Sequence, residues 1–456
     1  MEQIKEILEK VDLSDIPAEY ADLRVEKNDN SSIRWENGHS VEDISIKSKG
    51  FFLRVLKNGN WYYDSFTDLN KLPDKIKNAI SSLDKLSRGN FENICFEKDG
   101  FFELIKFSNF RNVNVDGTAK RNFISQTDKL LSEETYLARR NVHYRDRYSL
   151  RGFISSRGRK FIYDFSSFGM RVDYYLQKNQ EIFRGNYNRG ANNFNQLQQE
   201  YRNFPEQLEK SKYFISAPHI QPGVYPVIFS ELAVGVFAHE SFGHKSEADF
   251  MIGDKAMAEE WKMGKKVGSD ILSIIDDGSI EDSSGYTPFD DEGTAADKTY
   301  LVKNGVLSGR LHSVETAALL KEKPTGNGRA VDFQFQPIVR MTNTYIDSGD
   351  ETFDNLLDQA PGGIYIDQIK GGTGLSTFSI APLTAYTIKS GKLSEPINVS
   401  VVTGNVFKTL SRVRALSSKV KLYFSAEFGG CGKMEQMPLR VGFGGPKMLV
   451  AEMEVA

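Results

Sequence analysis

Cysteine is scarce in this 456-residue chain, which has only Cys95 and Cys431. Two cysteines cannot form the disulfide framework that holds small secreted domains together, so that class of protein is excluded. Long apolar runs are also missing, because the run at residues 232–238 (LAVGVFA) is far shorter than a membrane span of ~20 residues. The first residues, MEQIKEILEK, are charged and lack the apolar core of a signal peptide. We therefore expect a soluble, cytoplasmic protein with no membrane segment.

An excess of either charge is missing as well. The chain has 58 Lys and Arg against 61 Asp and Glu, a net charge of -3, so no overall field draws it to nucleic acid. Hydrophobic residues at 39% and charged residues at 26% are ordinary for a globular protein, and the length suffices for two or three domains. Aromatic residues at 12% favour sheet-rich packing over a helical bundle.

Turn signals and apolar alternation predict a fold rich in antiparallel sheet. Two Asn-Gly pairs, at 37–38 and 58–59, separate strand-like runs, and Asn-Gly accepts the positive φ angles of tight hairpins. Further along the chain hairpins recur with short helices between them, and no long alternation of strand and helix appears. We expect an α+β protein with two domains dominated by antiparallel sheet and flanked by helices.

The domain boundary is expected where prolines cluster, at Pro218, Pro222 and Pro226. Proline interrupts regular structure, and an Asn- and Gln-rich stretch at residues 185–203 precedes this cluster. We place an N-terminal α+β domain at 1–217 and a C-terminal domain at 218–456.

The segment from His239 to His244 (HESFGH) carries the strongest chemical signal. Imidazoles are common zinc ligands, and a carboxylate beside one, here Glu240, can act as a general base. The usual helical motif spaces its histidines i, i+4, but these are i, i+5 and lie roughly 140° apart on an ideal helix. A one-residue π-bulge would bring them onto one face, and Gly243 would ease the irregular turn. The alternative is two unrelated histidines, one packed and one at a helix end.

A third ligand is needed, and two residues could supply it. Glu247 lies three residues beyond His244 and could reach the same face. Cys431 lies in GGCGK, where flanking glycines would let the backbone approach an ion, although a free cysteine is more often a small buried hydrophobe. Cys95 has no such context, and we expect it to be structural.

Motif blocks in order along residues 220–456 resemble the TldD/PmbA metallopeptidases, a family once described as modulators of DNA gyrase. The N-terminal half resembles the family more loosely, and GGTGLSTFSIAPLTA at residues 371–385 departs from an aspartate-bearing stretch that is usual there. The blocks are HExxxH at His239–His244 followed by Glu247, DDEGT at Asp290–Thr294, NGVLSG at Asn304–Gly309, TGNGR at Thr325–Arg329, RMTNT at Arg340–Thr344 and CGK at Cys431–Lys433.

The resemblance implies a zinc-dependent metallopeptidase with one Zn²⁺ per chain, held in the C-terminal domain by His239, His244 and Cys431. It implies that Glu240 is the general base, which activates a zinc-bound water for attack on a peptide carbonyl. The intact histidine motif is similar to the catalytic, TldD-like branch, whereas the PmbA-like branch usually lacks it and serves as an inactive partner. No oxyanion donor can be named from the sequence, and His312 and Arg329 are candidates only because they lie near motif blocks.

The resemblance also implies a two-subunit particle that encloses the site. We expect a dimer, either of this chain or with a PmbA-like paralogue, that cuts unfolded or short peptides by holding them along a sheet edge. Two other functions stay open. Residues 139–160 hold eight basic residues and one acid, interleaved with aromatics, as in a nucleic-acid-binding regulator. The chain could also be an inactive partner subunit, against which the intact HExxxH motif and Cys431 argue.

Overall fold

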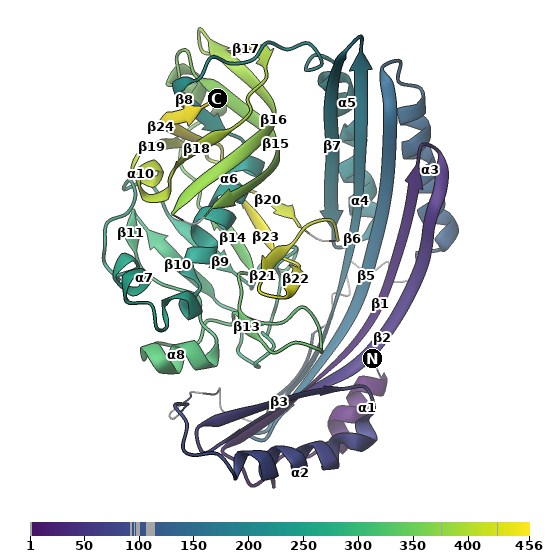
Figure 1. Ribbon diagram of the computed structural model, residues 1–456, viewed down its shortest axis with the longest axis vertical. Helices are drawn as coiled ribbons and strands as arrows, with labels where there is room; N and C mark the ends of the chain where they lie inside the picture. The colour runs from purple at the N-terminus through teal and green to yellow at the C-terminus, as the bar shows by residue number, and fades with distance from the viewer. Residues whose placement is uncertain are drawn as a thin grey trace.

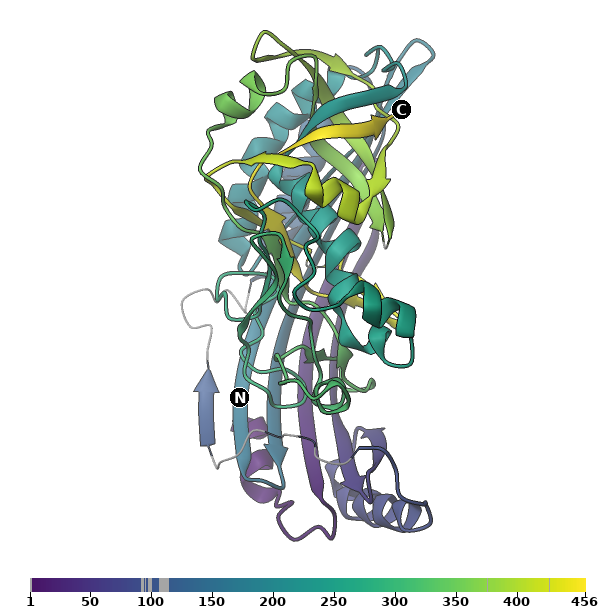
Figure 2. The same ribbon diagram turned by 90° about the vertical axis from the view of Figure 1, so that its left-hand side faces the viewer.

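The protein is an α+β fold in which a long curved sheet lies along one side of a body built from smaller sheets (Figures 1 and 2). Cys95 lies outside the described residues, so its expected structural role stays a prediction. The computed structural model describes residues 2–91, 94, 96, 101–105, 115–374, 376–425 and 427–456.

The long sheet has seven strands in the order β3-β2-β1-β5-β6-β4, with β7 paired to β6. Both predicted Asn-Gly turns are present, with φ of 48° at Asn37 and 52° at Asn58, so β1, β2 and β3 form an antiparallel meander. Strand β4 pairs with β6 in parallel, which no local pattern indicates. The strands are β1 (Tyr20–Glu36), β2 (His39–Lys57), β3 (Asn60–Phe66), β4 (Phe101–Ile105), β5 (Leu137–Ser155), β6 (Arg159–Lys178) and β7 (Glu181–Ala191).

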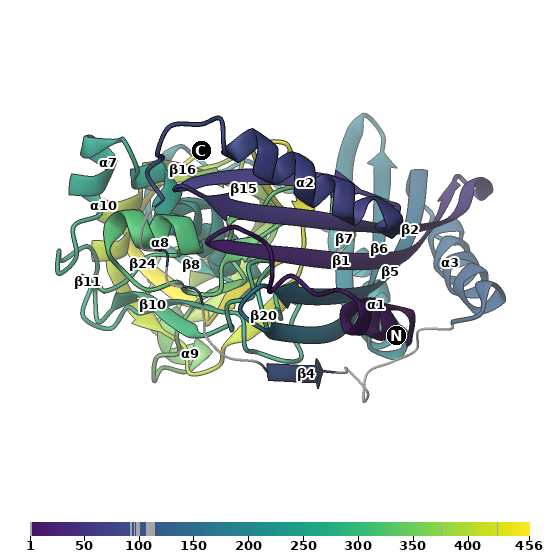
Figure 3. The same ribbon diagram turned by 90° about the horizontal axis from the view of Figure 1, so that it is seen from below.

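Both faces of this sheet are covered, and side-chain alternation along β5 shows how. Val142 and Tyr144 belong to the core formed with α3, α4 and α5, while Arg145 and Arg151 on the opposite face contact the C-terminal half. Helices α1 and α2 cover the end of the sheet near β3 (Figure 3). The helices are α1 (Glu2–Lys10), η1 (Leu69–Lys71), α2 (Leu72–Leu83), α3 (Gly117–Ser132), α4 (Phe194–Glu200), η2 (Tyr201–Asn203) and α5 (Phe204–Lys212).

The C-terminal half contains a six-stranded sheet in the order β11-β10-β9-β14-β23-β20 and a seven-stranded sheet in the order β15-β8-β24-β18-β16-β17, with β19 on β24. Most pairs are antiparallel, as expected, but β8 with β15 and β14 with β23 are parallel. The first strands are β8 (Gly223–Phe229), β9 (Ile274–Asp277), β10 (Lys298–Lys303), β11 (Val306–Leu307), β12 (Gly328–Arg329), β13 (Ile338–Val339), β14 (Asn343–Ile346), β15 (Ile364–Gly374) and β16 (Thr377–Lys389). The others are β17 (Lys392–Ile397), β18 (Val402–Asn405), β19 (Val413–Leu416), β20 (Lys421–Phe424), β21 (Cys431–Lys433), β22 (Gln436–Leu439), β23 (Gly442–Gly445) and β24 (Met448–Val455).

Helix α6 lies between these two sheets, in contact with β15 of one and β23 of the other. Its apolar face forms the centre of the largest core cluster, so the segment that follows it is held from both sides. The helices of this half are α6 (Glu231–Phe237), η3 (Ala238–Gly243), η4 (His244–Ser246), η5 (Ala248–Met251), α7 (Lys255–Glu260), α8 (Val314–Leu320), α9 (Phe353–Asp358) and α10 (Val406–Ser411).

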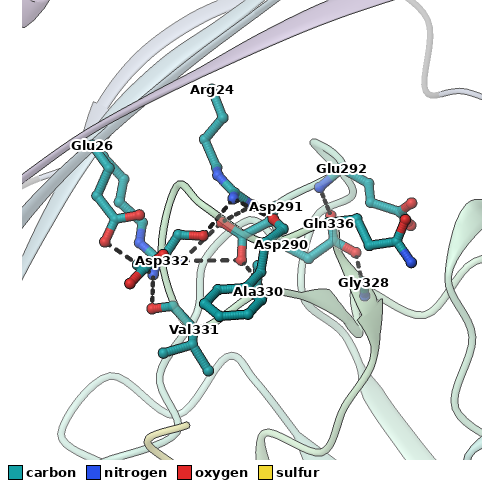
Figure 4. A network of polar contacts seen from close by, with 12 residues as sticks. Arg24, Glu26, Asp290, Asp291, Glu292, Gly328, Ala330, Val331, Asp332 and Gln336 are labelled. Atoms are coloured by element: carbon teal, nitrogen blue, oxygen red, sulfur yellow. Dashed lines mark hydrogen bonds and ion pairs between the residues drawn. The ribbon is translucent and has the colours of Figure 1, made fainter. Parts of the chain in front are cut away.

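A buried polar network joins the long sheet to the C-terminal half (Figure 4). Arg24 of β1 and Arg151 of β5 approach the carboxylate of Asp291 at 3.3 and 2.8 Å. Asp291 also accepts a hydrogen bond from the amide of Ala330 at 2.7 Å. The DDEGT block therefore has a structural role, because Asp291 places a carboxylate opposite the charges of two buried arginines.

The division of the chain at residue 217 stays a proposal; the residue lies in the connection between α5 and β8. Among the described residues, none of the helices combines the length and the apolar character that crossing a membrane requires.

Candidate metal centre

The histidine segment continues α6 directly. Ser230 begins the helix by accepting a hydrogen bond from the amide of Ala233 at 3.3 Å. After Phe237 the helix widens into a π turn, η3, and so the predicted bulge is present. The extra residue of this turn brings the rings of His239 and His244 together, with their centroids 5.2 Å apart.

Gly243 is needed in this turn for a different reason from the one expected. Its φ of -56° and ψ of -53° are ordinary helical values, so the turn does not demand the conformational freedom of glycine. What demands glycine is space, because a Cβ atom at this position would lie 2.0 Å from Sδ of Met341. Close packing of η3 against the C-terminal core therefore fixes the position of the histidine segment.

Cys431 reaches the histidines from the β21–β22 hairpin. Gly430 before it has a φ of 126°, which favours glycine, and a Cβ there would lie 2.8 Å from the carbonyl oxygen of Leu439. Arg340, which is fully buried, donates to the carbonyl oxygens of Cys431 at 2.5 Å and Gln436 at 3.1 Å. The arginine of the RMTNT block thereby holds both strands of the hairpin and fixes the place of the thiol.

The structure brings His239, His244 and Cys431 together. One donor atom from each lies within 4.8 Å of the other two, and Sγ of Cys431 is 3.5 Å from Nε2 of His244. The donors around a tetrahedral zinc ion are about 3.3–3.8 Å apart, because Zn–N and Zn–S bonds measure about 2.0–2.3 Å. Shifts of about 1 Å would therefore close these three donors around an ion and leave a fourth position open.

Glu247, the other candidate for third ligand, lies on the far side of His244. Its fully buried carboxylate is 3.3 Å from Nδ1 of His244 and 3.0 Å from Nζ of Lys433, which also donates to Asp249 at 2.7 Å. A carboxylate on the second ring nitrogen fixes the orientation of a metal-binding imidazole. Glu247 is therefore placed as a partner of His244, and the lysine of the CGK block holds it there.

The electrostatics of the cluster favour a thiolate at Cys431 and a proton on His244, which that imidazole releases when it binds a metal ion. Burial alone would raise the pKa of the Cys431 thiol, but the imidazoles of His239 and His244 lower it well below its usual range. Burial likewise opposes charge on His244, yet contacts with Cys431 and Glu247 raise its pKa to about 10. The cluster therefore holds a thiolate, which is the form of cysteine that binds metals.

The donor set fits zinc by a further observation. Nδ1 of His239 is buried and has no hydrogen-bond partner among the residues that the structure describes. Buried polar atoms are seldom left without a partner, and a bound ion or water would complete such a cluster. Two imidazoles, a thiolate and an open fourth position are the composition of a catalytic rather than a structural zinc site.

A cavity of about 360 Å³ opens beside the cluster and is lined by both His239 and Glu240. One wall comes from β6 and β7 of the long sheet and the other from β15 and β20. Glu240 is half-buried and lines the cavity beside the metal-binding cluster. The arrangement places a potential general base and an ion site along one cleft.

The two oxyanion candidates are wrong, because neither lines this cavity. Both ring nitrogens of His312 have partners, Thr316 at 3.1 Å and Glu322 at 2.9 Å. The guanidinium of Arg329 is buried and donates to backbone carbonyl oxygens, including that of Arg440 at 2.9 Å. Both residues therefore stabilise the fold around the site.

The loop at residues 427–430, just before Cys431, closes one side of the cavity and was not predicted from the sequence. The amide of Asn188 donates to the carbonyl oxygen of Phe428 at 2.8 Å, and the guanidinium of Arg145 lies over the ring of Phe428. The glycines before Cys431 were the only local signal for this loop, since its contacts come from the long sheet.

Several basic residues of the 139–160 stretch make contacts within the molecule, although Arg139 and Arg157 are exposed. Arg140 pairs with Asp128 at 2.6 Å, and Arg151 is buried against Asp291. These contacts neutralise positive charges that a nucleic-acid-binding protein would expose to bind phosphates. They favour a peptidase over a nucleic-acid-binding regulator.

Comparison with known proteins decides the family. Residues 222–456 match the PmbA/TldA metallopeptidase C-terminal domain, and residues 21–86 match domain 1 of the same family. The chain belongs to the PmbA/TldD metallopeptidase family. Its resemblance to that family is thus confirmed, and the chain is a metallopeptidase.

Individual relatives match either almost the whole chain or about half of it. A metalloprotease of Synechocystis is 31% identical over 448 residues, which cover 96% of this chain and 95% of the relative. A zinc metalloprotease TldD homolog of Saccharolobus solfataricus is 31% identical over 237 residues, 51% of this chain and 52% of that protein. The crystal structure of a Thermotoga maritima protein, with a proposed role as modulator of a DNA gyrase, superposes with a TM-score of 0.77 at 19% identity over 96% of each chain. This likeness shows that the fold is shared.

Proposed function

We propose that this chain is a zinc-dependent metallopeptidase that hydrolyses peptide bonds in unfolded or short peptides. The observation that carries the proposal is the convergence of His239, His244 and Cys431 beside a cleft that Glu240 lines. These three residues would hold one zinc ion per chain, and the similarity to a zinc metalloprotease of Saccharolobus supports zinc as the metal. When bound, zinc supplies a Lewis acid that polarises the peptide carbonyl and acidifies a water molecule.

Glu240 is the proposed general base. It is adjacent to a metal-binding residue in η3 but is not one of the three converging donors, so its carboxylate is free for proton transfer. It can take the proton of the attacking water and then return it to the leaving amine. The long sheet and the residues before Cys431 form walls of this cleft.

The substrate form follows from the size of the cleft. A cavity of about 360 Å³ admits a few residues of extended chain but no folded domain. A folded substrate would first have to lose its own free energy of unfolding, about 5–15 kcal/mol. We also propose a dimer, of this chain or with a PmbA-like paralogue, which light scattering after size exclusion would test.

The test of the function is a peptidase assay on an unfolded peptide with the zinc-loaded protein. Glu240→Gln should retain zinc and lose at least ~100-fold in rate, because an amide cannot accept the proton. The matched control is Glu259→Gln, an exposed change on α7 that should leave the rate unaltered. Full activity of Glu240→Gln would refute this mechanism.

A further inference from the structure

The cleft is lined by more basic than acidic side chains. Its lining includes four basic side chains, Arg171, Arg189, Lys370 and Lys421, whereas its acidic side chains are Glu200 and the proposed base Glu240. A concave site whose walls carry one sign of charge attracts ligands of the opposite sign.

The two arginines are already paired. Arg171 makes two hydrogen bonds of 2.8 Å to Asp173, and Arg189 is 3.9 Å from Glu200. Such pairs add little attraction for an incoming ligand, because their own carboxylates screen them.

The two lysines differ from the arginines. Lys370 and Lys421 are both exposed, and within the described part of the chain neither has a carboxylate at ion-pair distance. Nζ of Lys421 lies over the ring of Tyr423, 4.9 Å from the ring centroid. Their ammonium groups are therefore available to a ligand in the cleft.

Both lysines lie on strands that flank the helix leading to the proposed centre. Lys370 is on β15, two residues before Gly372. Gly372 packs closely against Val236 of α6, since a Cβ at Gly372 would lie 2.8 Å from that side chain. Val236 is three residues before His239. Lys421 begins β20, which also contacts α6. Lys370 directly precedes the stretch at 371–385 in which this chain departs from the pattern of the family it resembles.

We propose that the cleft selects peptides that carry a carboxylate near the bond to be cut, and that Lys370 and Lys421 recognise it. The inference rests on the peptidase function proposed above and adds a substrate class to it. The carboxylate can belong to an acidic side chain or to the C-terminus of a short peptide. Two unit charges about 4 Å apart in a water-like medium attract by an amount worth about fivefold in affinity, so we expect about fivefold for each lysine.

Binding to the Glu240→Gln variant, followed by fluorescence anisotropy, tests the selection without catalysis. Three labelled peptides share one neutral central sequence: the first is amidated, the second is amidated with one internal glutamate, and the third has a free C-terminus. We expect at least one carboxylate peptide to bind at least ~fivefold tighter than the neutral amide, and which of the two does so identifies the source of the carboxylate. Equal affinity for all three would overturn the proposal.

The lysines are tested by charge reversal in the same background. Lys370→Glu with Lys421→Glu should abolish or reverse the preference, while Lys392→Glu, an exposed lysine on β17 outside the cleft, should preserve it. A preference that survives the double reversal would overturn the role of the lysines. Cleavage of the three peptides by the unaltered enzyme separates the two proposals: no cleavage counts against the peptidase function, whereas unequal binding still supports carboxylate selection.

Discussion

Replacing Arg54 by methionine should destabilise the protein more than loss of an exposed ion pair of similar geometry. Arg54 is on β2, and its guanidinium donates to Asp22 at 2.6 and 2.9 Å and to Glu292 of the DDEGT block at 2.6 Å. All three side chains are 1% exposed. Arg54 therefore compensates two buried carboxylates, one from each half of the chain.

The magnitude follows from what methionine leaves behind. Removing one partner of a buried ion pair costs about 3–5 kcal/mol, because the other charge stays buried without compensation. Methionine keeps much of the volume of arginine, so the loss is electrostatic and we expect about 4 kcal/mol. Burial raises the pKa of Glu292 to about 7 even with Arg54 beside it. A carboxyl with a raised folded pKa is stabilising at low pH, and this is lost as the pH rises through that value, so the deficit should be larger at pH 8 than at pH 5.

Thermal unfolding of the unaltered protein and of Arg54→Met at pH 5 and pH 8 measures the loss of stability. A loss of about 4 kcal/mol corresponds to a fall in Tm of roughly 4 °C in a protein of this size, because the entropy of unfolding grows with chain length. The matched control is Arg171→Met, because Arg171 also makes two hydrogen bonds of 2.8 Å to an aspartate but is 44% exposed. An exposed pair contributes about 0–1 kcal/mol, so the control should change Tm little. Equal losses in the two variants would refute the argument that burial decides the cost.

Two further predictions concern the site and its surroundings. Glu247→Gln should weaken zinc binding by about 10–100-fold, because it removes the carboxylate that orients the imidazole of His244. Competition with a chromophoric chelator measures the affinity, and an unchanged affinity would show that the imidazole needs no carboxylate. Burial, with Arg145 nearby, lowers the pKa of His143 to about 4, so the folded state resists its protonation while Ser32 holds the neutral ring at 2.8 Å. The stability that His143 contributes is present above pH 6.5 and is lost, by about 2–3 kcal/mol, as the pH falls toward 4. The urea midpoint of the protein should therefore fall between pH 7 and 4.5, and His143→Gln should make this fall smaller. An equal fall in the variant would assign the pH dependence to other groups.

What the sequence could predict was local. The Asn-Gly pairs fix two hairpins through their own φ preferences, and the spacing of His239 and His244 implies the π turn because no regular helix brings them together. Gly243 was identified correctly, but for the wrong reason, since the sulfur that excludes a side chain there comes from Met341.

The remaining features depend on contacts between distant parts of the chain. The parallel pairing of β4 with β6 has no signal in the sequence, because the residue pattern of a strand is the same whether its partner runs parallel or antiparallel. The loop that closes the cleft is held by Arg145, whose hydrogen bond to the carbonyl oxygen of Glu427 joins residues 282 positions apart. The motif blocks DDEGT and RMTNT could be recognised as patterns, but their contacts with Arg151 and Cys431 become apparent only in the folded chain.

The central claim is that His239, His244 and Cys431 together hold one zinc ion. Zinc analysis of the purified chain, combined with X-ray absorption at the zinc edge, tests it most directly. We predict one zinc per chain with two nitrogen ligands and one sulfur ligand, loss of most of the metal in Cys431→Ala, and full retention in Cys95→Ala. Full zinc occupancy in Cys431→Ala would contradict the claim.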